Sequence, residues 1–443
     1  MTVPPASTAR HIVVVDVFLK DKTGHPYRIN RVAHDAAAER GIDYRTLCAE
    51  QNSIAEPWAL PTFKSNALIP PFTVKNLFRL LRRVYRRRAA TAGGTPEVVQ
   101  RLSVDERRRS SATRLLVAAV DVLNVVYLNA RTYVDLRRVL RQCAVDGQTL
   151  LMVQPVHVYM IFGFWLWCRV HGWSTGAQIV LFVEERLSPA VYRAVGWLFG
   201  RRVRFAVWWT PVGQDIQQYC GQSAVFIADP FDCGQPTRVT LKDKLRTQLV
   251  AGFLGGFRVV KGVETLTRAI HIVSLTPASR ARVRFVVQGN LWMASAVERQ
   301  LLAELDALAR AYPTFLTVVH RALDHDEYYS LLRKLDVVVL PYKTDGYYGL
   351  TPDGHYSGIL LEALSANKLA VVSSDTQLAA DGGRRVHTFT AGDAQALARS
   401  VLHAVDPCVY YAHVHANEEY ARQLAAEHAP RTYITKLLAL ALP

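Results

Sequence analysis

The stretch 336–373 constrains the fold of this chain more than any other part of the sequence. It begins with an uninterrupted apolar run at 337–340, which Pro341 ends, and a second apolar run follows at 369–372. Between the two runs, leucines recur at helical spacing. Short, fully apolar runs of this length are typical of buried strands. The stretch therefore predicts a strand, a loop, a helix and a second strand.

The start of this expected helix suits an anionic ligand. Ser357 is a favourable N-cap residue, and Gly358 has no side chain, so the amides of Gly358 and Ile359 can approach a ligand closely. The helix dipole favours negative charge at the same place, which suits a pyrophosphate. Glu362 lies one turn further on the same face. It either accepts hydrogen bonds from sugar hydroxyls or is a solvated acid near a helix start.

This motif resembles the nucleotide-binding element of the retaining glycosyltransferases of family 4. The run SGILLEALSANKLAVVSS is similar to their S-G-x-x-x-E-A-x-x-x-x-K signature, and the resemblance extends over the C-terminal half. It implies an α/β protein of the GT-B fold, with two doubly wound Rossmann-like domains that face a central cleft. It also implies a retaining transfer of sugar from a nucleotide sugar to an acceptor, with neither a metal ion nor another cofactor.

A second motif, GGFRVVKG, follows an apolar run at 249–254. Arg258 and Lys261 lie in this glycine-bounded loop, where two cations can face the charge of a leaving diphosphate; alternatively they are surface residues beside a turn. The loop is similar to the family's G-x-x-R/K-x-x-K-G phosphate loop, which implies that both residues act in catalysis. Gly289, at the end of the predicted strand 284–287, is a further candidate for donor binding.

The N-terminal half contributes three candidate residues. Gly24 and His25 lie in the predicted loop between a strand at 11–17 and the first helix, where a glycine lets backbone approach a ligand; a plain turn is the alternative. His157 follows the strand predicted at 149–153, and it is either an active-site or a structural histidine. By resemblance, Gly24 contacts the donor, His25 the acceptor, and His157 the reacting sugar.

One position departs from the family pattern. Many members carry a second glutamate eight positions before the equivalent of Glu362, and here that position is Gly354, between Asp353 and His355. In the family this acid contacts hydroxyls of the donated sugar. Either Asp353 replaces it, or the backbone amides of 354–357 do, and we count all three loop residues as candidates for donor binding. A non-catalytic binding protein of the same fold is the second interpretation.

A proline-rich stretch at 52–72 predicts an irregular loop, and a basic segment follows it at 74–88. In that segment apolar residues form one helical stripe and basic residues occupy the rest. Such a helix lies on an anionic membrane, packs on the domain with a solvated basic face, or lines a channel for a polyanion. We favour the membrane surface. The basic residues are Lys75, Arg79, Arg82, Arg83, Arg86 and Arg87.

The composition indicates which kind of partner and which cellular compartment to expect. A net charge of +16 indicates an anionic partner, but no basic pattern with interleaved aromatic residues predicts nucleic-acid binding. Six cysteines without a C-x-x-C pair fit a reducing cytosol. We see no secretory signal, and the apolar run 156–167 is too short to span a bilayer. We therefore expect a cytoplasmic protein, in part on the inner face of the membrane.

The chain of 443 residues is long enough for two domains. We predict an acceptor-binding domain at 1–235, a nucleotide-sugar-binding domain at 236–428, and a C-terminal helix at 429–443 that returns to the first domain. The acidic triplet 324–326 is better explained by a capping box with Glu327 than by a metal site.

Overall fold

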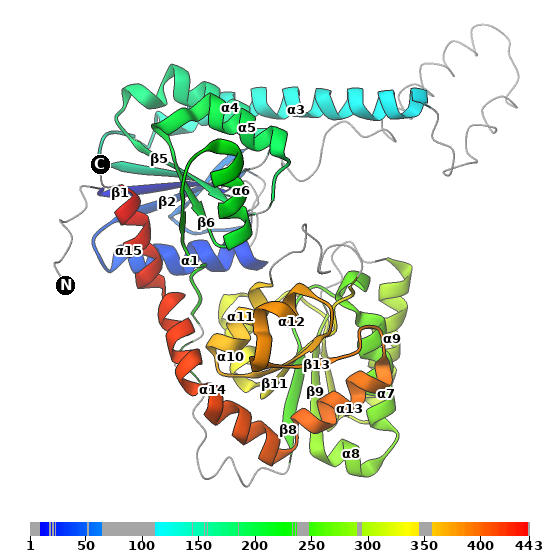
Figure 1. Cartoon of the computed structure of the whole chain (residues 1–443). Coiled ribbons are helices and arrows are strands. Elements are labelled where there is room, and N and C mark those ends of the chain that lie inside the picture. Colours follow the sequence, from blue (N-terminus) through cyan, green and yellow to red (C-terminus); the bar gives the residue numbers. More distant parts are fainter. Residues whose placement is uncertain are drawn as a thin grey trace, which may run out of the picture.

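The computed structural model describes residues 9–16, 19, 22, 24–50, 53–63, 111–143, 145–154, 156, 158–184, 186–232, 234, 236, 248–289, 295–344 and 357–441. These residues form two α/β domains, each built on one parallel sheet (Figure 1). The strand orders are β3-β2-β1-β4-β5-β6-β7 and β10-β9-β8-β11-β12-β13. In the first sheet β2 and β4 lie on opposite sides of β1, and in the second sheet β9 and β11 lie on opposite sides of β8. This is the doubly wound arrangement. The prediction of two Rossmann-like domains is confirmed.

The first sheet contains an edge strand that the sequence does not suggest. Its strands are β1 (His11–Val15), β2 (Asp43–Ala49), β3 (Ala59–Phe63), β4 (Thr149–Val153), β5 (Gln178–Val183), β6 (Arg204–Val207) and β7 (Ala224–Phe226). β3 lies within the stretch predicted as an irregular loop, so that prediction is wrong for 59–63. Pro61 lacks an N–H, but an edge strand tolerates proline because one side of it needs no partner.

Helices cover both faces of this sheet. They are α1 (Gly24–Ala38), α3 (Ser111–Leu140), α4 (Val158–Val170), α5 (Pro189–Phe199) and α6 (Thr210–Cys220). Val13 and Val15 of β1 pack into a core with α3 to α6, whereas Ile12 and Val14 pack with α1 on the other face. This alternation follows from the two-residue period of a strand. The strand is therefore apolar throughout, as a sheet covered on both sides requires.

The second domain repeats this arrangement. Its strands are β8 (Leu249–Phe253), β9 (Val283–Gln288), β10 (Leu316–Val319), β11 (Val337–Leu340), β12 (Leu369–Ser373) and β13 (Val386–Phe389). Its helices are α7 (Val263–Ser274), α8 (Pro277–Arg282), α9 (Ala296–Ala311), α10 (His325–Lys334), α11 (Gly358–Ser365), α12 (Gln377–Gly382), α13 (Ala394–Ala404) and α14 (Pro407–Glu427). The capping box predicted for α10 is confirmed: the Glu327 amide donates to Asp324, and the Asp324 amide donates to the Glu327 carboxylate.

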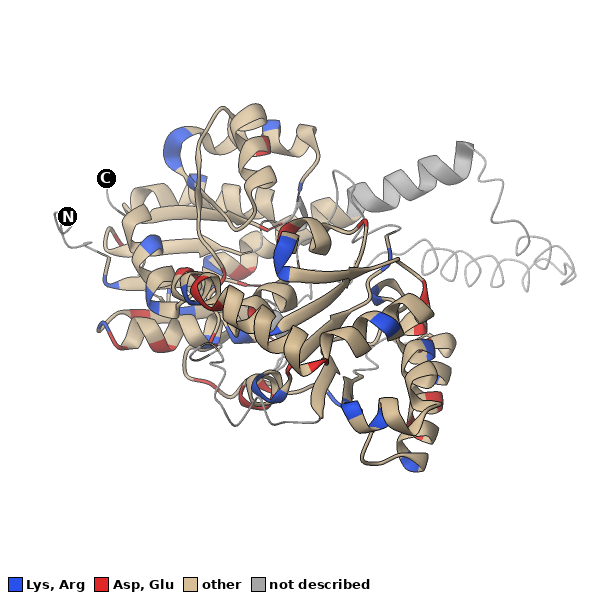
Figure 2. Cartoon of the chain, turned by 60° about the horizontal axis from the view of Figure 1, so that its bottom comes forward, with Lys and Arg blue, Asp and Glu red and all other residues tan. Residues whose placement is uncertain are grey.

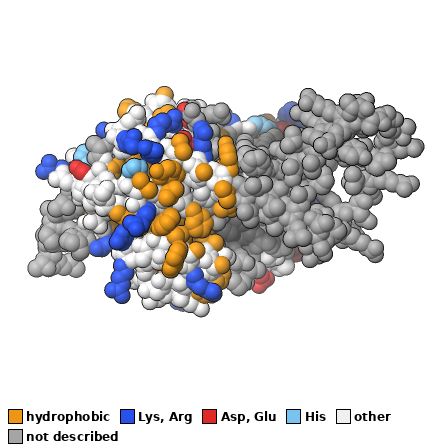
Figure 3. Space-filling view, turned by 90° about the horizontal axis from the view of Figure 1, so that it is seen from above, with side chains coloured by type: hydrophobic (Ala, Val, Ile, Leu, Met, Phe, Trp, Pro, Cys, Tyr) orange, Lys and Arg blue, Asp and Glu red, His pale blue; other side chains and the backbone are white. Residues whose placement is uncertain are grey.

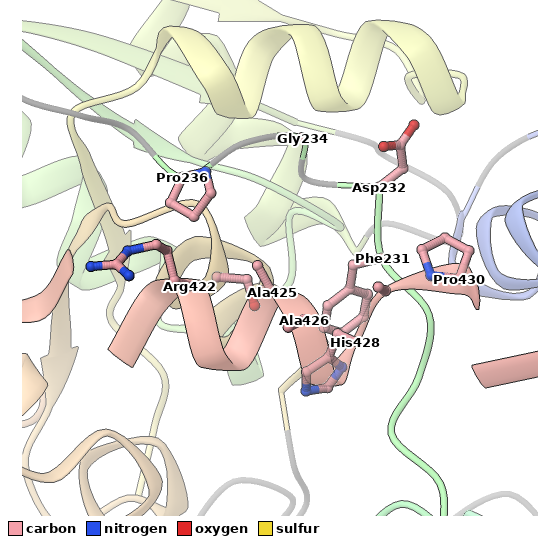
Figure 4. A pocket seen from close by; sticks show the side chains of 11 residues that line it. Phe231, Asp232, Gly234, Pro236, Arg422, Ala425, Ala426, His428 and Pro430 are labelled. Carbon is pink, nitrogen blue, oxygen red and sulfur yellow. The ribbon is translucent and has the colours of Figure 1, made fainter. Parts of the chain in front are cut away.

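The last helix, α15 (Pro430–Leu440), ties the two domains together. Tyr433, Ile434 and Leu437 are buried in the core that contains α1 and the first sheet. Burial of such side chains contributes roughly 1.5–3 kcal/mol each. At the crossing point, the His428 ring stacks on Phe231 with 4.5 Å between ring centroids, and its Nδ1 donates to the Asp229 carbonyl oxygen (Figure 4). Among the described helices, none is long and apolar enough to cross a bilayer.

Candidate functional site

The two sequence motifs meet at one point of the second sheet. The chain leaves β8 for β9 on one side and later returns to β11 on the other side of β8. In doubly wound folds, ligands bind at this switch point, beyond the carboxyl ends of the strands. The loop with Arg258 and Lys261 follows β8, and α11 follows β11. The topology therefore brings both predicted donor motifs to the same edge of the sheet.

Two glycines fix the path of the loop after β8. Gly255 has φ +111° and Gly262 has φ +69°, conformations that residues with a side chain rarely adopt. A Cβ atom on Gly262 would lie 1.6 Å from the carbonyl oxygen of Pro341, directly after β11. The loop thus packs on the backbone of the neighbouring strand. This close packing places Lys261 beside the residues that follow β11.

The side chains from the two motifs converge on Gly255. A Cβ atom there would lie 3.2 Å from Lys261 Nζ and 3.1 Å from Ile359 Cδ1. Lys261 Nζ is also 5.4 Å from the ring centroid of Tyr342, a buried residue that follows β11. An ammonium group, a glycine backbone and the first turn of α11 therefore lie together. Such a set of groups suits an anion, because the glycine allows close approach.

The start of α11 differs in one detail from the prediction. Ser357 occupies the N-cap position, but its side chain accepts no capping hydrogen bond from the helix. Ser357 lies near Tyr342, whose pKa is raised by burial although the Ser357 side chain acts to lower it. The amides of Gly358 and Ile359 have no acceptor among the residues that the structure describes. They are therefore oriented for a ligand, as helix starts allow.

A buried carboxylate holds the loop that carries Arg258. Glu298 of α9 accepts hydrogen bonds from the amides of Val259, at 2.8 Å, and Ser295, at 2.6 Å. Burial alone would raise the pKa of Glu298, but these bonds and the Arg258 charge outweigh it and lower the pKa. Glu298 was not among the predicted site residues. The sequence feature that could have indicated Glu298 is its capping-box spacing from Ser295, and this capping box is present in the structure.

The end of β9 supports the same loop. The Gln288 Oε1 accepts a hydrogen bond of 2.6 Å from the Gly255 amide, and its Nε2 donates to the Arg321 carbonyl oxygen. Gly289 follows at the carboxyl end of β9, where a Cβ atom would lie 3.0 Å from a methyl group of Leu302. Gly289 is thus adjacent to the loop after β8, and Gln288 is a positioning residue that the sequence did not single out.

Glu362 is buried rather than solvated. It is 1% exposed, and the hydroxyls of Tyr328 and Tyr329 donate hydrogen bonds to its two oxygens. Arg28 Nη2 lies 3.5 Å from Glu362 Oε1, and the guanidinium carbon lies 4.0 Å from the Tyr328 ring centroid. Both carboxylate oxygens of Glu362 thus already have partners in the structure. The expected contact with ribose stays a prediction.

Arg28 belongs to α1 and brings the first domain to this site. Burial disfavours its charge, but Glu362 and the two tyrosines outweigh this effect and raise the pKa of Arg28 above its usual range. Asp229 of the linker between the domains is also close: burial and then the Glu362 charge raise the pKa of its carboxyl. We call Arg28, Asp229, Tyr328, Tyr329 and Glu362 the interdomain cluster.

The remaining predicted residues are placed as follows. Gly24 and His25 form the first turn of α1 rather than a loop, so the loop prediction is wrong there. Pro26 is compatible with this, because the first turn of a helix needs no N–H donor. The other candidates lie outside the described residues: His157, Asp353, Gly354, His355, and the basic residues Lys75, Arg79, Arg82, Arg83, Arg86 and Arg87.

Two cavities lie at the crossing point between the domains. One of about 450 Å³ is lined by Phe231, Arg422 and Pro430, among others (Figure 4), and one of about 380 Å³ lies between Arg31 and His325. None of the donor candidates that the structure describes lines either cavity. Within the described part of the chain, no three His, Cys, Asp or Glu side chains are grouped to hold a metal ion.

Replacing Gly262 with alanine tests the close packing of the loop on Pro341. Gly392, with φ +79° and nothing within 4 Å of a Cβ atom, is the matched control. Gly392→Ala should cost about 1–2 kcal/mol from backbone strain alone. We expect Gly262→Ala to lower the free energy of unfolding by about 2 kcal/mol more, because of the clash. Urea unfolding of both variants measures the difference, and equal losses would contradict the packing.

Comparison with known proteins agrees with this geometry. Residues 248–406, which include both motifs, match the family model described as Glycosyl transferases group 1. No curated protein matches the sequence. Solved structures share the fold, among them the trehalose-6-phosphate synthase OtsA (12% identity; 96% of this chain and 98% of that chain; TM-score 0.57).

Two further neighbours span nearly the whole chain. One is a glycosyltransferase from Rickettsia africae ESF-5 (9% identity; 97% and 96% of the two chains; TM-score 0.56). Another is Anabaena Alr3699/HepE, solved in complex with UDP and glucose (12% identity; 96% and 97%; TM-score 0.51). The fold is therefore GT-B. The family match and these neighbours together support the glycosyltransferase superfamily.

Proposed function

We propose that the protein is a retaining glycosyltransferase that moves a sugar from a nucleotide sugar to an acceptor without a metal ion. One observation carries the proposal: Lys261, the Gly255 backbone and the start of α11 lie together at the switch point of the second sheet. A nucleoside diphosphate is the ligand that suits this set of groups. The match of residues 248–406 to the glycosyltransferase family model supports the same class.

The proposed roles follow from charge. As the bond between the sugar and the diphosphate breaks, negative charge grows on the leaving oxygen, and Arg258 and Lys261 stabilise it. The amides at the start of α11 and the helix dipole add to this field, which is the part that a divalent cation plays elsewhere. We further propose that Glu362 contacts the ribose and His157 the transferred sugar. Asp353, or the amides of 354–357, would bind its hydroxyls.

The acceptor is proposed to bind the first domain, near the end of β1 and the start of α1. A glycan or a lipid-linked saccharide is the class that we propose, in the synthesis of cell-surface polysaccharide or glycolipid. The neighbour solved with UDP and glucose makes UDP-glucose the first donor to test. We propose a cytoplasmic location for the enzyme, where nucleotide sugars are available.

A thermal-shift screen against UDP-, GDP-, ADP- and dTDP-linked sugars tests the donor site. A ligand that binds only the folded protein at 100 times its Kd stabilises it by about 2.7 kcal/mol. We expect one nucleotide series to raise Tm, with EDTA present as well as absent. Lys261→Ala should show a smaller shift at the same donor concentration, whereas Lys334→Ala, which removes an exposed lysine at the end of α10, should keep the full shift. A uniform lack of response would argue against the donor site.

The alternative is a binding protein of the same fold without turnover. Two observations favour it: Gly354 replaces the family's acid, and Glu362 is occupied by Arg28 and two tyrosines. The two functions differ in one measurement. Release of free nucleoside diphosphate from the donor that shifts Tm would exclude the binding protein, whereas donor binding without any release would support it.

A further inference from the structure

The first domain exposes large apolar side chains on the outer side of three neighbouring helices. Figure 3, viewed from above Figure 1, shows hydrophobic side chains gathered on this side, with basic side chains around them. Trp197 is 83% exposed and Val126 is 62% exposed, although soluble proteins rarely expose a contiguous patch of this kind. We call this patch the outer face. Its residues are Val126, Tyr127 and Val134 of α3, Leu166 and Val170 of α4, and Trp197 of α5.

The three helices form one continuous layer. The Gly163 amide of α4 donates a hydrogen bond of 2.8 Å to the Asn129 side chain of α3, and a Cβ atom on Gly163 would lie 2.1 Å from the Asn129 carbonyl oxygen. The Trp165 ring of α4 donates a hydrogen bond of 2.8 Å to the Leu198 carbonyl oxygen of α5. The inner sides of the same helices fill the core of the domain. The outer face is therefore held rigidly.

Basic residues outnumber acidic residues around this face. The stretch 158–214, which contains α4 and α5, carries six arginines and two glutamates, at positions 184 and 185. Arg186 is bound to Asp215, and the other five arginines are exposed. On α3, Asp135 is 2% exposed and paired with Arg131 and Arg138. Positive charge therefore predominates around the outer face.

Two arginines also pair with one tryptophan next to α4. The guanidinium carbons of Arg202 and Arg169 lie 4.4 Å and 5.8 Å from the centroid of the Trp173 ring. Aromatic rings, arginine stems and aliphatic side chains together are the groups that enter the boundary between lipid headgroups and acyl chains. Basic residues occur on both domains (Figure 2), but the exposed apolar residues of the described chain gather mainly on the first.

We propose that the outer face binds the surface of a bilayer that contains anionic lipids. A second copy of this chain is a poorer occupant, because a two-fold interface would bring the arginines of one copy against those of the other. Near such a surface, each basic residue contributes about 1 kcal/mol, and the apolar side chains add their transfer from water. This binding does not depend on the proposed function. It would hold the first domain at the membrane, where a lipid-linked acceptor lies.

Flotation of the full chain with vesicles tests this proposal. The vesicles contain phosphatidylcholine alone, or phosphatidylcholine with about one-quarter phosphatidylglycerol. We expect flotation with the anionic vesicles only, weakened by salt because the arginines are exposed. Trp197→Ala together with Arg201→Gln and Arg202→Gln should lower the bound fraction at least tenfold. Leu275→Ala with Arg310→Gln and Arg384→Gln, at exposed positions of the second domain, is the matched control and should bind as the original chain does.

Several outcomes would overturn the proposal. One is a failure of the original chain to float with anionic vesicles, and another is equal flotation of the triple variant. A third is loss of flotation on deletion of residues 74–88 alone, which would place the lipid contact in the basic segment. Light scattering of the free protein adds a fourth: a dimer that the triple variant abolishes would show that the outer face binds a second copy. Each of these measurements is independent of any donor.

Discussion

Lys261→Ala is expected to lower the rate of sugar transfer by about 10²–10³-fold, the range found when one fixed group that stabilises transition-state charge is removed. Lys261 Nζ lies beside the Gly255 backbone and Ile359, where the proposed diphosphate would bind. An alanine leaves the positive charge of Arg258 and the α11 dipole, so transfer should fall without vanishing. Release of nucleoside diphosphate, measured at saturating donor, gives the turnover of the variant.

The control for this experiment is another lysine of the second domain. Lys334→Ala removes an exposed charge at the end of α10, so its turnover should stay within twofold of the original. Lys261 is only half-buried, and we expect Tm of Lys261→Ala to fall by no more than a few degrees. Full turnover in Lys261→Ala, with an intact fold, would refute the assignment of this loop to the diphosphate.

The sequence predicts most of the second domain because its signals are local. The bounds of β11 agree with the predicted apolar run at 337–340. The start of α7 at Val263, directly after Gly262, also agrees with the prediction. Buried parallel strands are continuous apolar runs, and helix starts carry caps, so both are visible within a few residues. The glycines of the Lys261 loop are equally visible. The positive φ angles of Gly255 and Gly262 explain why glycine stands at these two positions.

The parts that the sequence does not predict depend on long-range contacts. β3 contains a proline and becomes a strand only because it lies at the edge of the sheet. α1 begins at Gly24, although its first turn contains Gly24 and Pro26, two residues that usually interrupt helices. Arg28 appears in the sequence as one charged residue of a helix, and nothing near it indicates that it will meet Glu362 of the other domain. Residues paired across two domains leave no local pattern.

Arg28→Ala is expected to lower the free energy of unfolding by about 3–5 kcal/mol, the cost of removing one partner from a buried ion pair. Glu362 would lose the nearby guanidinium while it stays next to the buried Asp229. Arg31→Ala is the matched control on the same helix. Arg31 pairs with Asp35 at the surface and donates one hydrogen bond to the Tyr27 hydroxyl, so its loss should cost no more than about 2 kcal/mol. Urea unfolding of the two variants gives the comparison.

The buried position also changes what Glu362→Ala should do. Its loss would leave the hydroxyls of Tyr328 and Tyr329 without their acceptor and Arg28 without its counter-charge, so the fold should weaken as well as the activity. Glu362→Gln keeps an acceptor for the tyrosines. In a double-mutant cycle, Glu362→Gln should therefore recover part of the stability lost in Arg28→Ala, with a coupling energy of about 1–3 kcal/mol. Additive losses would mean that Arg28 and Glu362 do not stabilise one another.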